Sequence, residues 1–359
     1  MNDRVYMDWN ATAPLRPEVR SAMIAAMDAV GNPSSVHAEG RIARSIIERS
    51  REQVANLVGI ERSEVIFTSG ATEAATLASK GRKLACANIE HDCVFAHQYA
   101  SIPVDQNGEL LLEAVEGDLL AVQASNSETG VLQNNIRWAQ RAWEQNAMVL
   151  VDAVQSAGKF GTNLGDLGAD FLMLSAHKLG GPKGVGALCI KLGVEVEPTI
   201  SGGGQEEGRR SGTENIIGIA GFGAAAEAAE KERKDGKWDA LYDLRNYMER
   251  QIAEIAPEAV FYGKDAPRLT NTSCFGVHGW KGETQVMQMD LAGYAISAGS
   301  ACSSGKVKAS RVLQAMGFDD VTASSAIRVS LGPTNTKEEI DGFVSTWGKA
   351  YTKFRVKAA

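Results

Sequence analysis

The sequence has few of the features that mark exported, membrane-spanning or nucleic-acid-binding proteins. Only five of its 359 residues are cysteines, with no CxxC pair and no His/Cys cluster at metal-ligand spacing. We therefore expect free thiols in a reducing compartment and no metal site. No apolar run reaches about 18 residues, and the first residues lack the apolar core of a signal peptide, which predicts a cytoplasmic protein without a membrane span. The formal charge is −7 and no basic stripe is present, so we expect no nucleic-acid partner.

The middle of the chain alternates short apolar runs with amphipathic segments. A segment such as 136–146 is long enough for a helical crossover between parallel strands. This alternation predicts an α/β fold with a mostly parallel sheet covered on both faces. The expected strands are residues 64–68, 85–89, 119–123, 148–151, 171–174 and 186–190.

The pattern changes after a long helical stretch at 217–255. Short strands then alternate with helices, as expected of a smaller α+β domain. The strands are expected at 260–262, 272–277, 295–297 and 326–329. Residues 1–14 are expected to be irregular and to return to the domain interface. We therefore divide the chain into a large domain (15–257) and a small domain (1–14 with 258–359).

A lysine follows one of the expected buried strands, in Ser175-Ala176-His177-Lys178. Its amine should emerge at the carboxyl edge of the sheet, where open α/β folds bind ligands. An amine desolvated there has a lowered pKa and can form a Schiff base with pyridoxal 5′-phosphate (PLP). Taken alone, the same pattern also fits a strand-end lysine that reaches water.

The segment Thr68-Ser69-Gly70-Ala71-Thr72-Glu73 follows a strand and opens a helix. Small residues let backbone N–H groups approach a phosphate, and the helix dipole favours its charge. The Thr72 hydroxyl can add a donor. The segment is not a GxxxxGK[ST] loop, so a lone phosphate fits better than a nucleotide. A capped strand–helix turn without a ligand would look the same.

Asp152 ends another expected strand, upstream of Lys178. A carboxylate there suits a cationic partner such as a protonated pyridinium nitrogen, which makes the ring an electron sink. Gln155 could reach the ring hydroxyl. The alternative for Asp152 is an N-cap of the next helix.

Two further polar residues stand beside or within apolar runs. His91, in Glu90-His91-Asp92-Cys93, could stack on a heteroaromatic ring and move protons near neutral pH. Arg328, inside the run 326–329, needs an anion, and a substrate carboxylate would satisfy it. The alternatives are a structural histidine and an internal salt bridge.

Cys302 lies in the Gly/Ser-rich run 299–305. Such a run is expected to form an exposed loop that buries little. Because its neighbours cannot bury the side chain, we interpret Cys302 as a reactive thiol rather than a small core residue.

Taken together, these motifs resemble the cysteine desulfurases of the class V aminotransferase family, which are fold-type-I PLP enzymes. The resemblance covers nearly the whole chain. It extends to the subgroup tied to nitrogen fixation and iron–sulfur cluster assembly. The matching segments are Asp8-Trp9-Asn10-Ala11-Thr12-Ala13-Pro14, Gly31-Asn32-Pro33-Ser34-Ser35-Val36-His37, Ser175-Ala176-His177-Lys178 and Ala298-Gly299-Ser300-Ala301-Cys302.

The resemblance implies a large mostly parallel seven-stranded sheet domain and a smaller α+β domain that carries the cysteine loop. It implies removal of sulfur from L-cysteine, leaving L-alanine and a persulfide on Cys302 for an iron–sulfur scaffold or another sulfur acceptor. It also implies a homodimer in which Thr213 reaches the phosphate of the neighbouring subunit. The implied roles are catalysis for Cys302, Lys178 and His91; cofactor binding for Lys178, Ala71, Thr72, His91, Asp152, Gln155, Ser175, His177, Thr213 and Ser127; and substrate binding for Arg328, Asn10 and Asn126.

One departure from the family pattern concerns Ser127, in Asn126-Ser127-Glu128-Thr129-Gly130, where the family usually has a second asparagine. Two rival hypotheses stay open. One is a selenocysteine lyase or another class V aminotransferase on the same scaffold, which the fold alone does not exclude. The other, supported only by Ser127, is a catalytically weak PLP-binding partner in a sulfur-transfer complex. Cys302 favours the desulfurase, because transamination needs no thiol.

Overall fold

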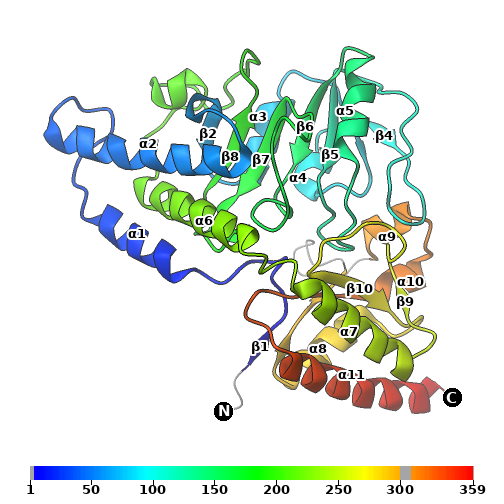
Figure 1. The fold of residues 1–359 in the computed structure, drawn as a ribbon. Coiled ribbons are helices and arrows are strands. Elements are labelled where there is room, and N and C mark those ends of the chain that lie inside the picture. The colour runs from blue at the N-terminus through cyan, green and yellow to red at the C-terminus, as the bar shows by residue number, and fades with distance from the viewer. Residues whose placement is uncertain (1–3, 300–308, 359) are drawn as a thin grey trace.

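The computed structural model describes residues 4–299 and 309–358, and its largest element is a seven-stranded sheet (Figure 1). The strand order is β2-β8-β7-β6-β5-β3-β4. β8 is antiparallel to both of its neighbours, and the remaining pairs are parallel. The predicted mostly parallel sheet is confirmed. Its strands are β2 (Val65–Thr68), β3 (Leu84–Ala87), β4 (Gln98–Ile102), β5 (Leu119–Gln123), β6 (Met148–Asp152), β7 (Phe171–Ser175) and β8 (Gly186–Ile190).

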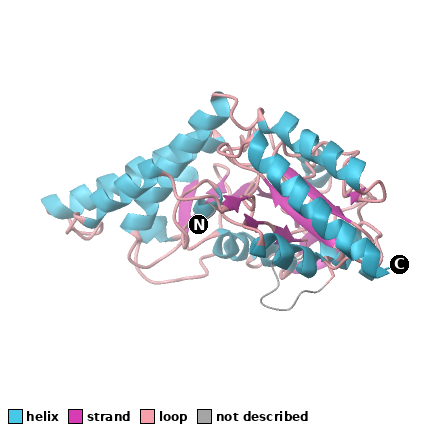
Figure 2. Cartoon of the chain, turned by 90° about the horizontal axis from the view of Figure 1, so that it is seen from below, coloured by secondary structure: helices cyan, strands magenta, loops and turns pink. Residues whose placement is uncertain are grey.

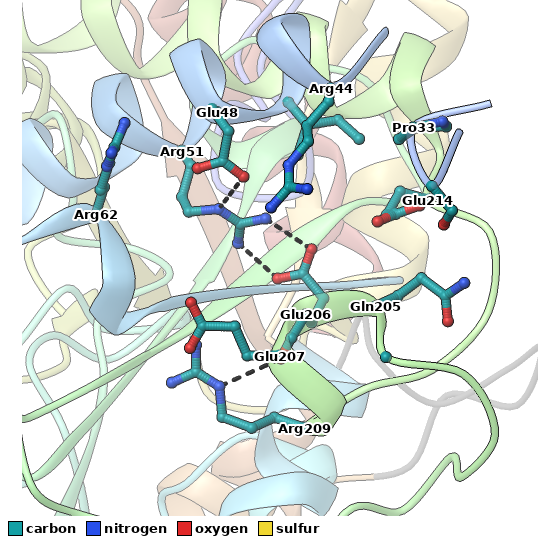
Figure 3. Close-up of a pocket in the computed structure, with 13 residues that line it drawn as sticks. Pro33, Arg44, Glu48, Arg51, Arg62, Gln205, Glu206, Glu207, Arg209 and Glu214 are labelled. Atoms are coloured by element: carbon teal, nitrogen blue, oxygen red, sulfur yellow. Dashed lines mark hydrogen bonds and ion pairs between the residues drawn. The ribbon is translucent and has the colours of Figure 1, made fainter. Parts of the chain in front are cut away.

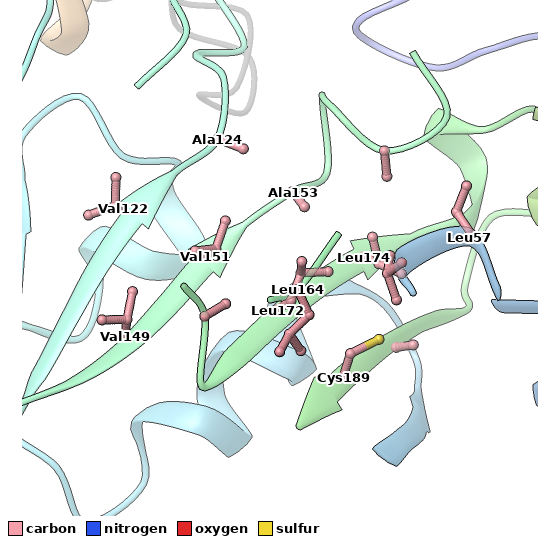
Figure 4. Close-up of a cluster of buried hydrophobic side chains, with 14 of the residues drawn as sticks. Leu57, Val122, Ala124, Val149, Val151, Ala153, Leu164, Leu172, Leu174 and Cys189 are labelled. Atoms are coloured by element: carbon pink, nitrogen blue, oxygen red, sulfur yellow. The ribbon is translucent and has the colours of Figure 1, made fainter. Parts of the chain in front are cut away.

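Both faces of this sheet are covered, which explains why its strands are almost continuously apolar. Val151 and Leu172 point to one face (Figure 4), where they pack in a cluster with side chains of α2 (Ala38–Val58), α5 (Asn135–Trp143) and α6 (Ile216–Lys234). Leu150 and Phe171 point to the opposite face, where α3 (Ala71–Ser79) and α4 (Asp92–Phe95) cover the sheet. Each fully buried side chain of this size contributes roughly 1.5–3 kcal/mol. α1 (Pro17–Met27) packs outside α6.

A second, four-stranded antiparallel sheet has the order β12-β13-β10-β9. Three helices pack against it with an apolar cluster that includes Phe275 and Trp347. Leu313 and Ala323, from two further helices, belong instead to the main cluster of the larger sheet. Figure 1 shows this part below the larger sheet, and Figure 2 shows the molecule from that lower side. The strands are β9 (Val260–Phe261), β10 (Thr272–Gly276), β12 (Ser297–Ala298) and β13 (Ala326–Ser330). The helices are α7 (Leu241–Ile255), α8 (Gly282–Leu291), α9 (Arg311–Ala315), α10 (Asp320–Ser324) and α11 (Lys337–Ala358).

The structure differs from three sequence expectations in detail. The helical stretch at 217–255 is two helices, because Gly236 adopts a left-handed conformation (φ 72°) just beyond α6. The strand expected at 295–297 is divided between β11 (Tyr294–Ala295) and β12, which join different sheets. Residues 1–14 are not wholly irregular, since β1 (Val5–Tyr6) pairs in parallel with β11. No helix within the described ranges combines the length and apolar character needed to cross a bilayer.

Candidate active site

A cleft of about 540 Å³ opens where the carboxyl ends of β5, β6 and β7 meet the N-terminal segment and β13. This is the edge at which open α/β sheets bind ligands. Eleven of the residues singled out in the sequence line it together. They are Asn10, Ala71, Thr72, His91, Ser127, Asp152, Gln155, Ser175, His177, Lys178 and Arg328.

Lys178 reaches the cleft because a single 3₁₀ turn, η2 (Ala176–Lys178), follows β7 directly. Its Nζ donates hydrogen bonds to the carbonyl oxygens of Asn10 (2.5 Å) and Ala11 (2.9 Å). The N-terminal segment therefore lies against the lysine predicted to carry the cofactor. Lys183 also lines the cleft.

Asp152 is the last residue of β6 and is buried. Its Oδ1 accepts a hydrogen bond from the backbone N–H of Val154 (2.9 Å). Burial raises the pKa of this carboxyl above its ordinary value, against the lowering effects of that hydrogen bond and of His91 and Lys178. A cationic ring nitrogen bound beside it would supply the missing positive partner.

The start of α3 also faces the cleft. Its N-cap, Gly70, has no side chain to bond the first-turn N–H groups, which leaves those donors available to an anion. Thr72 adds a hydroxyl at the same end, and both Thr72 and Ser175 line the cleft. Burial lowers the pKa of His177 to about 4, and its Nδ1 lies 3.2 Å from Thr12 Oγ1. His177 therefore faces the cleft as a neutral imidazole near pH 7.

His91 is the N-cap residue of α4, the helix that follows β3 in the chain. Its Nδ1 accepts a hydrogen bond from the Cys93 backbone N–H (3.2 Å) and lies 3.0 Å from Cys93 Sγ. Capping of this short helix thus fixes the ring orientation. His91 therefore has the structural role that the sequence left as an alternative, and it also lines the cleft as predicted.

Arg328 in β13 is almost completely buried, and it forms the internal salt bridge that the sequence left as an alternative. Its Nη2 lies 2.8 Å from Asp8 Oδ1, and its Nη1 donates to the carbonyl oxygen of Ser127 (2.9 Å). Its Nε has no hydrogen-bond partner in the described part of the chain. The guanidinium therefore keeps its Nε–H for a further acceptor.

Two of the predicted residues that the structure describes do not line the cleft. The Asn126 Oδ1 accepts hydrogen bonds from the Glu128 and Thr129 N–H groups, and its Nδ2 donates to the Ile89 carbonyl, so its amide holds a loop. Thr213 is exposed and lines a separate pocket of about 140 Å³ with Ser69 and Gly184. Cys302 lies outside the described residues.

The side chains that line the cleft without having been predicted as site residues include Cys93, Gln123 and Ser125. Gln123 ends the buried strand β5, and this polar residue at a strand end was the available signal. Gln123 Nε2 and Ser125 Oγ are buried without a hydrogen-bond partner among the described residues. Unsatisfied buried donors in a cleft fit a polar ligand with several acceptors, as PLP is.

A second cavity, of about 560 Å³, lies between α2 and the segment before Thr213 (Figure 3). Glu206 is buried there and accepts two hydrogen bonds from Arg51, at 2.6 and 2.9 Å, and one from the Phe67 N–H. Glu206 and Glu207 have left-handed backbones (φ 47° and 57°), a conformation that costs energy in non-glycine residues. The ion pair therefore holds a strained turn against β2, and this turn leads to Thr213.

Comparisons with known proteins agree with this arrangement. Residues 5–343 match the model of the family described as aminotransferase class-V. A protein named cysteine desulfurase IscS from Dictyoglomus turgidum is 36% identical over 380 residues, covering 99% of this chain and 96% of the relative. A protein named cysteine desulfurase from Cereibacter sphaeroides is 39% identical over 368 residues, covering 94% and 93%.

Solved structures include a NifS-like protein from Rickettsia africae, with a TM-score of 0.89 and 31% identity over 97% of this chain and 99% of that one. Another, described as SspA in complex with cysteine, has a TM-score of 0.76 and 29% identity over 92% and 100%. The sequence resemblance and the fold class are thereby confirmed. This chain belongs to the class V aminotransferase family, and within that family to the cysteine desulfurases.

Proposed function

We propose that the cleft binds pyridoxal 5′-phosphate and that the protein removes sulfur from L-cysteine, leaving L-alanine and a persulfide on Cys302. One observation carries this proposal. The buried Asp152 ends β6, and Lys178 lies in the 3₁₀ turn that follows the neighbouring strand β7. Both residues line one cleft, together with the uncapped start of α3.

The described residues fit the cofactor. Lys178 would hold its aldehyde carbon, Asp152 its ring nitrogen, and the start of α3 with Thr72, Ser175 and His177 its phosphate. When bound, the cofactor supplies a ring that stabilises negative charge at the substrate α-carbon. Asp152 keeps that ring cationic by accepting its N–H, a role favoured in a buried site where opposite charges interact strongly.

Arg328 is the proposed anchor of the substrate carboxylate, through the Nε that lacks a partner and the edge of its guanidinium. Asp8 limits its net positive charge, so a carboxylate would share this cation with Asp8 rather than meet it alone. His91 or Lys178, both in the cleft, would move the α-proton. Cys302 would take the substrate sulfur and carry it to an acceptor.

The proposed partners are a second copy of this chain and a sulfur acceptor, such as an iron–sulfur scaffold protein. Large apolar side chains are exposed on α1, on α2 and between these helices, as expected of a surface that another chain covers. They include Met27 (59% exposed), Val30 (93%), Val36 (87%) and Ile42 (57%). In the dimer, Thr213 would reach the phosphate of the other subunit.

The proposed division into two domains places the boundary after residue 257, with residues 1–14 joining the second part. Two features support it. Many apolar side chains around the four-stranded sheet form a cluster of their own, although Cys274, Leu313 and Ala326 belong to the main cluster of the larger sheet. The first residues pair with β11 and with Ser330, in the second part of the chain.

The deciding experiment measures sulfide and alanine formed from L-cysteine by the purified protein with PLP and an excess of a thiol reductant, which reduces the persulfide and releases its outer sulfur as sulfide. We expect both products in equal amounts. Lys178→Ala should lose the visible absorbance of the bound cofactor together with activity. Cys302→Ser should keep that absorbance and lose sulfide release.

The rival hypotheses give different results. Alanine and selenide from selenocysteine, with little product from cysteine, would indicate a lyase of selenocysteine. Keto acid formation that survives Cys302→Ser would indicate an aminotransferase. PLP binding without turnover of either amino acid would indicate a weak partner protein.

A further inference from the structure

Lys159 is a buried amine that the proposed reaction does not use. The residue is 6% exposed, and its Nζ donates hydrogen bonds to Asn10 Oδ1 (3.0 Å) and Gln155 Oε1 (2.9 Å). The face of the Trp238 ring lies 5.5 Å from the same atom. No carboxylate in the described part of the chain forms an ion pair with it. Its hydrogen-bonding partners are two amides that line the cleft.

A lysine in this setting is costly. Burial lowers its pKa well below the usual range, and the positive charges of Lys178 and Arg328 lower it further. A methionine would fill a similar volume without burying a polar atom. A functional reason for burying this amine exists if its two hydrogen bonds hold side chains that line the cleft.

The two bonds orient the amides. Gln155 Oε1 is held by Lys159, so its Nε2 is directed to the carbonyl oxygen of Asn10 (2.8 Å). That same carbonyl oxygen accepts from Lys178 Nζ. Asn10 is fixed on its other side, because its Nδ2 donates to Thr272 Oγ1 (2.9 Å) in β10. A chain of hydrogen bonds thus runs from Lys159 through Gln155 and Asn10 to the amine of Lys178.

We propose that Lys159 is a positioning residue of the cofactor site, where its amine holds the amides of Asn10 and Gln155 and, through Asn10, the amine of Lys178. The inference rests on the proposed function, since it concerns the site in which PLP would bind. It adds a residue that lies outside the cleft lining and that touches neither cofactor nor substrate.

The test compares PLP binding by the cofactor-free full-length protein and its variants. Lys159→Met keeps the length and removes both donors. We expect its PLP dissociation constant to rise about tenfold, as expected for the loss of one to two hydrogen bonds. The midpoint of the pH titration of the cofactor's visible band should also shift. Lys159→Gln keeps an N–H donor group on a shorter side chain and should lose less affinity, which also gives a second variant if the methionine variant folds poorly.

Arg268→Met is the matched control. Its side chain is 6% exposed and pairs with Glu249 (2.8 Å), and neither residue lines the cleft. We expect it to lower the melting temperature without changing PLP affinity or the pH titration. Unchanged affinity and titration in Lys159→Met would overturn the inference. Equal losses of affinity in Lys159→Met and Arg268→Met would overturn it too, by showing a merely structural cost. Failure of the unaltered protein to bind PLP would instead reject the proposed function itself.

Discussion

The Nδ1 atom of His91 lies 3.2 Å from the backbone nitrogen of Cys93 and 3.0 Å from its Sγ. Because a backbone N–H can only donate, Nδ1 acts as the acceptor, and the neutral imidazole carries its proton on Nε2. The thiol is thus held against the ring nitrogen at the start of α4. Both residues line the cleft, so the site contains a described thiol beside its candidate proton carrier.

This position predicts selective labelling of Cys93. Cys93 is 9% exposed, whereas the other described thiols lie in the sheets and are not exposed at all. Burial raises the pKa of Cys86 to about 12 and that of Cys189 and Cys274 higher still. In cofactor-free Cys302→Ser protein, iodoacetamide should therefore modify Cys93 first. PLP at ten times its dissociation constant should slow labelling about tenfold, because protection follows occupancy.

Peptide mapping by mass spectrometry identifies the labelled residue. Cys93→Ala in the same background should remove the fast label. A first label on Cys86, or labelling of Cys93 that PLP does not slow, would contradict this placement of the thiol.

Removing the charge of Asp8 from the Asp8–Arg328 pair should destabilise the protein, and a bound substrate carboxylate should reduce this loss. The two side chains are 16% and 3% exposed, so Asp8→Asn leaves a buried cation without its counter-charge. We expect the free energy of unfolding to fall by about 3 kcal/mol. A bound carboxylate would restore the missing charge. L-Alanine should therefore raise the melting temperature more in Asp8→Asn holoenzyme than in the unaltered holoenzyme.

Asp290→Asn provides the control, because the Arg4–Asp290 pair is solvent-exposed (58% for each side chain). This change should alter stability by less than about 0.5 kcal/mol. If L-alanine stabilises all three proteins equally, Arg328 does not bind the carboxylate.

Glu128 predicts a pH dependence of stability. Burial raises its pKa from 4.5 to about 7, although Ser310 Oγ donates a hydrogen bond to its Oε2 and opposes the shift. The folded protein therefore keeps a proton that the unfolded chain releases above pH 4.5. The contribution of protonated Glu128 to the free energy of unfolding is present in full below pH 4.5 and is lost as the pH rises to about 7.

Glu128→Gln cannot release that proton. Relative to the unaltered protein, it should gain stability between pH 5 and pH 8, by at most roughly 3 kcal/mol. Urea unfolding at several pH values measures the difference. A constant difference across this range would show that Glu128 has the same pKa in the folded and unfolded states.

The proposed shared site predicts that cofactor and dimer stabilise each other. If Thr213 reaches the partner's phosphate, PLP binds the dimer preferentially and shifts the association equilibrium by mass action. Removal of PLP should then weaken dimerisation. Thr213→Ala should lower PLP affinity by about 1 kcal/mol, the value of one hydrogen bond.

Sedimentation of cofactor-free and cofactor-loaded protein at several concentrations provides the measurement. Identical association constants for the two forms, or a stable loaded monomer, would refute the shared site.

The sequence alone determined the fold class, the family and most of the cleft. Continuous apolar runs predicted strands buried on both faces, and polar residues at their ends, such as Asp152 and Lys178, marked the ligand edge. This works because parallel strands bring their carboxyl ends to one side, so local motifs far apart in the chain converge without any further information. The position of the helix start at Ala71 and Thr72 was also predictable, because it follows the end of a strand, β2.

Only the tertiary structure decided which partner each polar group takes. Arg328 meets Asp8 across 320 residues of chain, and Asn10 joins Lys159, Gln155 and Lys178. The side-chain amide of Asn126 forms hydrogen bonds within a loop and does not line the cleft. Sequence patterns report local periodicity and burial, whereas the partner of a buried polar group depends on distances between segments that are set when the sheets and the N-terminal segment pack together.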